Sequence, residues 1–121
     1  MAFPMIQFKA TNTVLEGNLQ DLVERKFASL ERYLGASTDL KCEVEFEKIA
    51  LHQHGSVYRV EVNFYRDGQL FRTEATEESF ENAIDKVRSQ LDMEMKKSVK
   101  KRDTLVKRGG RAIKHMLRFG K

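Results

Sequence analysis

The sequence predicts an α+β domain, in which a four-stranded sheet carries two helices packed on one face, followed by a basic C-terminal tail. Four short segments alternate apolar and polar residues, which is the period of a half-buried strand. Two longer segments place their apolar residues three or four positions apart, as on one face of a helix. The segments follow the order β-α-β-β-β-α, so the three strands after the first helix can pair as an antiparallel meander.

A change of period separates the first strand from the first helix. Residues from Met5 to Thr11 alternate apolar and polar side chains, which predicts a half-buried strand. From about Glu16 to Leu34 the spacing becomes helical, and Gly35 follows as a residue that readily adopts the left-handed conformation at a helix end. The apolar stripe of this helix consists of Leu19, Leu22, Val23, Phe27, Leu30 and Leu34.

Strand alternation then returns in three segments. The second strand is expected over Leu40–Ile49 and the third over Tyr58–Phe64. The Asp67-Gly68 pair supplies the positive φ of a tight hairpin turn, which joins the third strand to a fourth near Leu70–Ala75. In the second strand we expect Leu40, Cys42, Val44 and Phe46 to face inward, and Lys41, Glu43, Glu45 and Glu47 to face outward.

The second helix follows the fourth strand. Thr76 is its expected N-cap, and Glu77 and Glu78 would complement the positive end of the helix. Its apolar stripe consists of Phe80, Ala83, Ile84, Val87, Leu91 and Met95. At about 100° per residue, the opposite side carries cations, so the end of this helix is predicted to have a cationic outer face. These cations are Lys86, Lys96, Lys97 and Lys100.

Charge is divided unevenly along the chain. Residues 1–95 have a formal net charge of −6, whereas residues 96–121 have +10, with Asp103 as their one acid. A block this basic on an acidic globular body is typical of a protein that binds a polyanion. A tail that only aids solubility is the alternative. Such tails seldom carry apolar residues, however, and this one contains Ile113, Met116, Leu117 and Phe119.

The domain organisation follows from this division. We expect a folded domain over residues 1–102 and a basic tail over residues 103–121 that is flexible or folds on binding. Gly109-Gly110 is the first place that must break a continuous helix, and the segment after it has the spacing of a short amphipathic helix. From Arg102 onward the candidate RNA-binding residues are Arg102, Lys107, Arg108, Arg111, Lys114 and Arg118.

The sheet face without helices is predicted to be acidic. Glutamates on the outward side of the second and third strands would occupy it, and they would repel nucleic acid. We therefore expect the binding surface on the helix side. The glutamates concerned are Glu43, Glu45, Glu47 and Glu61.

Catalytic and metal-binding patterns are weak. His52 and His54 flank Gln53 in an expected loop, and with one distant cysteine, Cys42, they cannot complete a tetrahedral zinc site. Neither a Gly-rich phosphate loop nor a Ser–His–Asp or Cys–His arrangement is present. We expect a non-enzyme without metal, cofactor or small-molecule substrate. No apolar run approaches the ~20 residues that span a bilayer, so we also expect a cytoplasmic protein that does not bind a membrane.

Three stretches carry a resemblance to a known family. They are the first strand Ile6-Gln7-Phe8, the segment Val23–Tyr33, and above all Ala83-Ile84-Asp85 leading into Leu91, Met95, Lys96, Lys97, Lys100 and Lys101. Over roughly residues 5–102 the chain resembles the ribosome hibernation promoting factor / ribosome-associated inhibitor A family. The chain departs from that family's basic pattern at Ser29, Gln90, Met93 and Glu94, so part of the positive face is displaced into residues 100–121.

The resemblance implies a function in translation. Family members bind the small ribosomal subunit and its RNA, in the channel of messenger RNA and transfer RNA anticodons, and silence idle ribosomes under stress. The 70S ribosome is the wider partner, and ribosome modulation factor is a further candidate partner. The positions that resemble the family's RNA-facing residues are Lys26 and Arg32 on the first helix, and Lys97 and Lys101 on the second.

Two other classes of function remain open. A general double-stranded RNA-binding module shares an α-β-β-β-α core, but its lysines lie at the start of the last helix, where this chain has Glu77, Glu78 and Glu81. A protein-interaction adaptor could instead dock its basic tail on an acidic partner. Binding to purified RNA would separate the adaptor from the two RNA-binding classes.

Overall fold

The computed structural model describes residues 3–49 and 55–107, and for residues 102–107 it describes the backbone alone. The elements follow the predicted order, and the α+β prediction is confirmed. The strands are β1 (Ile6–Thr11), β2 (Leu40–Lys48), β3 (Tyr58–Arg66) and β4 (Gln69–Glu77), and the helices are α1 (Gly17–Phe27), the 3-10 helix η1 (Ala28–Tyr33) and α2 (Phe80–Lys107).

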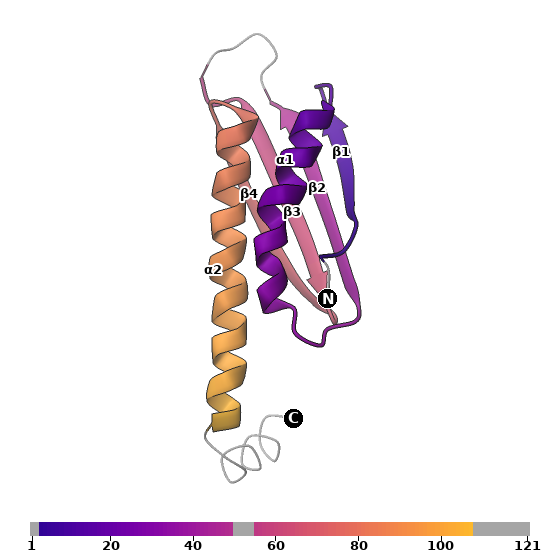
Figure 1. Ribbon diagram of the computed structural model, residues 1–121. Helices are drawn as coiled ribbons and strands as arrows, with labels where there is room; N and C mark the ends of the chain where they lie inside the picture. The colour runs from indigo at the N-terminus through magenta and orange to yellow at the C-terminus, as the bar shows by residue number, and fades with distance from the viewer. Residues whose placement is uncertain (1–2, 50–54, 108–121) are drawn as a thin grey trace.

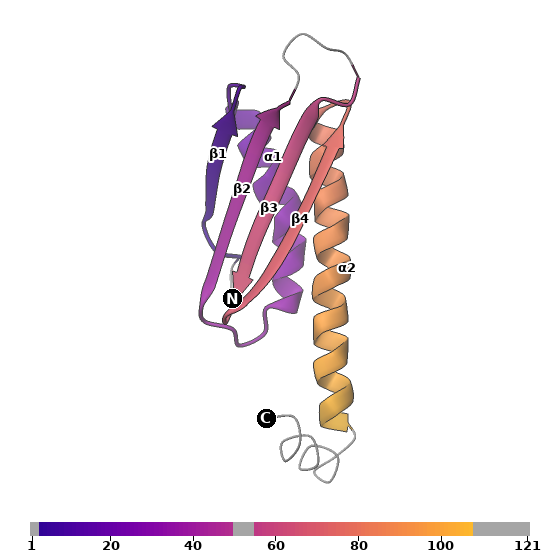
Figure 2. The same ribbon diagram turned by 180° about the vertical axis from the view of Figure 1, so that it is seen from behind.

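The four strands form one mixed sheet in the order β1-β2-β3-β4. β1 runs parallel to β2 with Phe8 opposite Val44, while β2, β3 and β4 form the expected antiparallel meander. A parallel pair needs a crossover connection, which α1 and η1 supply. Both helices therefore cover the same face of the sheet, and Figures 1 and 2 show the other face bare.

The core lies between that face and the two apolar stripes. The stripe of α2 is buried from Phe80 to Met95, as its spacing predicts. On the sheet, the expected inward residues of β2 are buried with the exception of half-buried Leu40. Cys42 is fully buried, and burial raises the pKa of its thiol to about 12, which keeps the thiol protonated and unreactive.

The hairpin between β3 and β4 confirms the predicted turn. Asp67 and Gly68 have φ angles of 49° and 87°, the two positive values that a two-residue hairpin turn of type I′ requires. The Asp67 carboxylate accepts hydrogen bonds from the backbone N–H groups of Asp39, at 3.0 Å, and Thr38, at 3.3 Å. These bonds lower the pKa of Asp67 and tie the turn to the segment that enters β2.

The first helix differs from the expected single α-helix. The α-helix ends at Phe27 and the chain continues as the tighter 3-10 helix η1 before Gly35, whose φ of 55° confirms the predicted left-handed stop. The Ser29 hydroxyl donates to the Lys26 carbonyl, at 3.0 Å. Such a bond competes with the backbone bonds of an α-helix, and it lies at the change of helix type.

The predicted N-cap of the second helix is wrong. β4 extends through Glu77, with Thr76 paired opposite Arg59, so Thr76 and Glu77 belong to the sheet. The helix begins after Ser79, whose hydroxyl accepts a hydrogen bond from the Asn82 N–H at 3.1 Å. Strand pairing with β3 thus moves the helix start three residues along the chain, to the next residue that can cap it.

Helix α2 continues through Lys107 and includes the backbone of residues 103–107, which the sequence places in the tail. The expectations for His52, His54 and residues 108–121 lie outside the described residues. In the part of the chain that is described, no helix is both long and apolar enough to cross a membrane.

The cap of α2 can be tested by substitution. We expect Ser79→Ala to lower the free energy of unfolding by about 1 kcal/mol, because the N–H of Asn82 loses its partner. Ser79→Asp, which keeps a side-chain acceptor, serves as the control and should unfold close to wild type in a urea titration. Equal destabilisation by both substitutions would contradict the cap.

Candidate nucleic-acid interface

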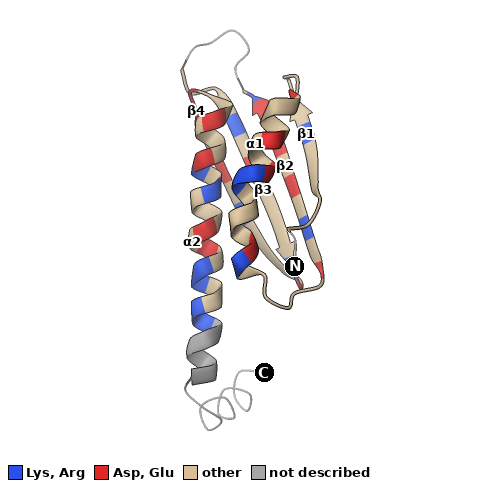
Figure 3. Ribbon diagram, in the orientation of Figure 1, with Lys and Arg blue, Asp and Glu red and all other residues tan. Residues whose placement is uncertain are grey.

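The charges of α2 are sorted along its length. Figure 3 shows acidic residues near the start of the helix, by the end of β4, and basic residues toward its other end. Glu81 lies in the first turn, whereas four lysines fall within residues 96–101. Glu81 complements the positive end of the helix dipole, and the four lysines create a positive surface toward the other end.

The predicted lysines of α2 form an exposed surface, which we call the cationic helix face: Lys86, Lys96, Lys97, Lys100 and Lys101. They lie away from the buried stripe, as the helical projection predicts. Lys97 is 69% exposed, and its Nζ lies 3.9 Å from a Glu94 carboxylate oxygen, a loose contact in the same helix. A phosphate could replace this contact at little cost, because exposed ion pairs contribute only about 0.2–1 kcal/mol.

Lys26, a predicted RNA contact on α1, lies in a contact between the two helices. Its Nζ donates to the Asp85 carboxylate of α2 at 2.5 Å, and its side chain is 33% exposed. Lys26 therefore joins the two helices in this structure. The sequence places both residues correctly on their helices but does not reveal that they meet.

Arg32, the other predicted contact of the first helical segment, pairs with Asp92 of α2. Its guanidinium lies 2.9 Å from the carboxylate and 4.9 Å from the centre of the Tyr33 ring. The Tyr33 hydroxyl donates to the same Asp92 oxygen, at 2.9 Å. Partial burial acts to raise the pKa of Asp92, but the bonds from Tyr33 and Arg32 outweigh it, so the pKa lies below its ordinary value.

Arg66 is an anchoring residue that the sequence reading missed. It is 4% exposed and donates to the Tyr33 carbonyl at 3.2 Å and to the Ser98 hydroxyl at 2.7 Å. Its guanidinium also lies 5.1 Å from the centre of the Phe71 ring. Arg66 thus connects the end of β3 to η1 and to the basic half of α2. Its position two residues after Phe64 continues the alternation of inward residues in β3, and this is the signal from which the burial of Arg66 could have been predicted.

The bare face of the sheet carries the expected glutamates, but several of them are held in ion pairs. The Arg59 guanidinium bonds Glu47 at 3.1 Å, Glu61 at 2.9 Å and Glu74 at 2.5 Å. Arg72 bonds Glu61 from the neighbouring strand at 2.5 Å. This network shields Glu61 so well that it is only 8% exposed although no helix covers it. The face is therefore an ion-pair network in which two arginines partly offset three glutamates, rather than a row of unpaired carboxylates.

The network shifts the ionisation of Glu61. Burial acts to raise its pKa, but the hydrogen bonds and positive charges of Arg59 and Arg72 together lower it. A lowered pKa means that the folded state binds a proton less readily than the unfolded state does. The ion pairs therefore stabilise the fold fully above the ordinary Glu value, and this contribution is lost as the pH falls below it.

With its geometry described, the chain can be compared with known proteins. It is a small α+β domain whose last helix ends in a cationic face. The family model described as Sigma 54 modulation protein / S30EA ribosomal protein matches residues 6–103, and the chain belongs to this family. The match confirms the resemblance seen in the sequence and places the chain in a family of ribosome-associated proteins.

Solved structures share the fold. The Protein Y N-terminal domain from Thermus thermophilus matches with a TM-score of 0.55 and 22% identity, over 77% of this chain and 98% of that chain. A ribosomal subunit interface protein from Coxiella burnetii matches with a TM-score of 0.60 and 16% identity, over 77% of this chain and 94% of that chain. A search of curated proteins finds no significant match.

Acid unfolding tests the network on the bare face. We expect the free energy of unfolding of the wild-type protein to fall as the pH is lowered from 6 through the ordinary Glu value of 4.5, because the unfolded state takes up protons first. Glu61→Gln cannot titrate at this position, so its urea midpoint should depend less steeply on pH over the same range. A variant slope equal to that of wild type would contradict the lowered pKa.

Proposed function

We propose that this protein binds the small ribosomal subunit in the decoding channel and inhibits translation by occupying the space of messenger RNA and transfer RNA. The observation that carries the proposal is the cationic helix face at the basic end of α2, in a chain that belongs to a family of ribosome-associated proteins. Cytoplasmic location, binding to the 70S ribosome and joint action with ribosome modulation factor are parts of the same proposal.

The mechanism is steric and electrostatic. Each lysine or arginine that meets a phosphate releases condensed counterions from the RNA, which favours binding at low salt. The buried stripe of α2 and the anchor of Arg66 at Ser98 hold the helix against the sheet. A rigid body fixed in this way can fill the channel without any chemical step.

The helix side suits RNA better than the bare sheet face does. On the sheet face, Glu47, Glu61 and Glu74 hold the Arg59 guanidinium, and a phosphate there would have to displace a carboxylate that is already well bonded. On α2, Lys97 makes only a 3.9 Å contact within its own helix. Lys97 can therefore meet a phosphate without breaking the fold.

Double-stranded RNA binding is the alternative function, and the start of α2 counts against it. That class of domain places lysines at the start of its last helix. In this chain the corresponding turn carries Glu81, preceded by exposed Glu78. Two carboxylates at this position would repel the phosphates that such a domain must bind.

Charge reversal on α2 tests the binding surface. Lys97→Glu with Lys101→Glu should weaken ribosome binding and relieve inhibition in a cell-free translation assay. Stability should change by no more than about 0.5 kcal/mol, because both side chains are exposed.

Glu43→Lys with Glu45→Lys is the matched control on the bare sheet face, which should leave binding close to wild type. Strong effects of the sheet substitutions, with none of the helix substitutions, would place the binding surface on the other side of the domain.

The tail can be tested by salt dependence. Because α2 extends through Lys107, truncation after this residue removes five cations and spares the described helix. Each cation that meets a phosphate contributes roughly 0.7–0.9 to the slope of log K against log salt. The truncated protein should therefore show a slope shallower by up to about 4. An unchanged slope in ribosome-binding measurements would mean that the tail makes no phosphate contacts.

A further inference from the structure

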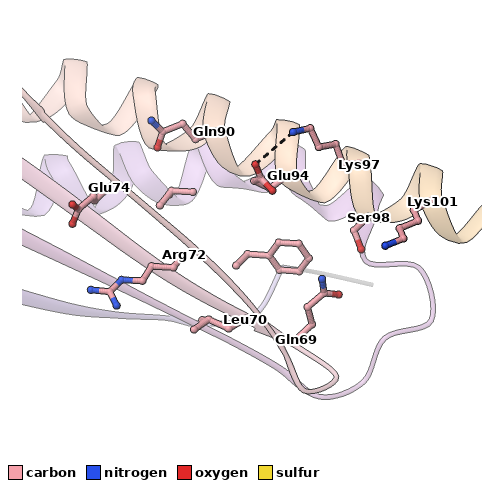
Figure 4. A pocket seen from close by; sticks show the side chains of 11 residues that line it. Gln69, Leu70, Arg72, Glu74, Gln90, Glu94, Lys97, Ser98 and Lys101 are labelled. Atoms are coloured by element: carbon pink, nitrogen blue, oxygen red, sulfur yellow. Dashed lines mark ion pairs between the residues drawn. The ribbon is translucent and has the colours of Figure 1, made fainter. Parts of the chain in front are cut away.

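An open groove of about 730 Å³ lies between β4 and the basic half of α2. Figure 4 shows the groove from close by, with strand side chains on one wall and helix side chains on the other. The strand wall is formed by Gln69, Leu70, Phe71, Arg72, Thr73 and Glu74, and the helix wall by Gln90, Glu94, Lys97, Ser98 and Lys101. The function proposed above uses two of these lysines but not the groove itself.

The strand that lines the groove is an edge strand. Among the described strands, β4 pairs with β3 alone, and the register opposes Arg66 to Gln69 across the two-residue turn. In such a hairpin these two residues exchange both of their backbone hydrogen bonds. Along the strand that follows, the backbone N–H and C=O groups of alternate residues bond the partner strand, and those of the residues between them point to the outer edge. The backbone groups of Leu70, Arg72 and Glu74 therefore point outward, and no other described segment bonds them.

The walls of the groove add three features to this free edge. Leu70, which is 48% exposed, lines the groove near the β3–β4 turn, and Lys97 and Lys101 line the helix wall. Thr73 is 7% exposed, and its hydroxyl has no hydrogen-bond partner among the described residues. A buried polar atom without a partner is uncommon in a folded protein, and here it belongs to a residue that lines the groove.

We propose that this groove binds an extended acidic peptide segment of another protein, which adds to β4 as a fifth strand. The outward N–H and C=O groups recur every second residue, about 6.6–6.8 Å apart, which is the repeat of an extended main chain. Side chains on the helix side of the added strand would face Lys97 and Lys101. Glu94 lies on the same wall and makes a loose contact with Lys97, but the wall keeps a net positive charge, which favours carboxylates there. Those on the other side would lie beside Leu70.

A peptide fits the edge of β4 better than an RNA strand does. Phosphate oxygens accept hydrogen bonds but do not donate them, and the 2′-hydroxyls and base N–H groups of RNA do not form the regular row of donors and acceptors that a main chain presents to a strand edge. A peptide main chain offers a donor and an acceptor at each residue that it pairs. Because it also uses Lys97 and Lys101, the peptide would compete with RNA for the cationic helix face.

The test uses the full chain and a fluorescein-labelled, eight-residue peptide of alternating Val and Glu. Amide NMR of the wild-type protein should show the Leu70, Arg72 and Glu74 N–H signals shifting and gaining protection from hydrogen exchange. The N–H groups of Phe71, Thr73 and Ala75, already bonded to β3, should gain little. The same peptide with every amide N-methylated has no main-chain donor on either edge, so it cannot form the ladder and should not bind.

A matched pair of variants distinguishes the contribution of the β4 main chain to peptide binding from that of the Arg72 side chain. Arg72→Pro and Arg72→Ala both remove the guanidinium, but only the proline removes an outward N–H, and proline is tolerated at an edge strand. We expect Arg72→Pro to bind the peptide about tenfold more weakly than Arg72→Ala in fluorescence anisotropy.

Four results would overturn the proposal: no binding of the peptide, equal binding by the two variants, undiminished binding of the N-methylated peptide, or protection of these amides by a single-stranded uridine octamer instead. The last result would assign the groove to RNA. None of these results depends on whether the protein binds ribosomes, so the two proposals can fail separately.

Discussion

The burial of one stripe of α2 against the sheet is the constraint on which the surface of this protein depends. Residues from Phe80 to Met95 are held in the core, and this fixes the rotation of the helix. With the rotation fixed, the lysines of the helix must face outward. The buried stripe ends at Met95, and four exposed lysines follow within residues 96–101.

Ion pairs between the helical segments add a small stabilisation to this packing. Lys26 meets Asp85, and Arg32 meets Asp92 together with Tyr33. Both pairs are partly exposed, so each contributes about 0.2–1 kcal/mol at most. Lys26 and Arg32, which the sequence predicts as RNA contacts, thus form ion pairs between helices in the free protein. Because the pairs are weak, a phosphate can still recruit either cation.

The sequence predicts the elements of this fold well because their signals are local. The stripes of α1 and α2, the turn at Asp67-Gly68 and the stop at Gly35 each depend on a few neighbouring residues. The N-cap of α2 was misplaced because Thr76 and Ser79 are both good capping residues. The choice between them depends on how far β4 stays paired with β3, and that is a tertiary contact.

The site was less predictable because its charges depend on partners distant in the sequence. Arg59 joins Glu47, Glu61 and Glu74 on three strands. Its pairing with Glu61, two residues along the same strand, follows from strand alternation, but the pairings with Glu47 and Glu74 depend on the order and register of the strands. Arg66 reads as a turn residue until its bonds to Tyr33 and Ser98 are seen. For the lysines of α2, the helical period alone predicts that they lie outside the core, and the described ones are exposed.

Sedimentation with purified ribosomal particles tests the central claim most directly. The full chain would be mixed with 30S, 50S and 70S particles at low salt and centrifuged through sucrose. The account predicts that the protein travels with the 30S and 70S particles and not with the 50S particles. Sedimentation with the 50S particles alone, or with none of the three, would contradict it.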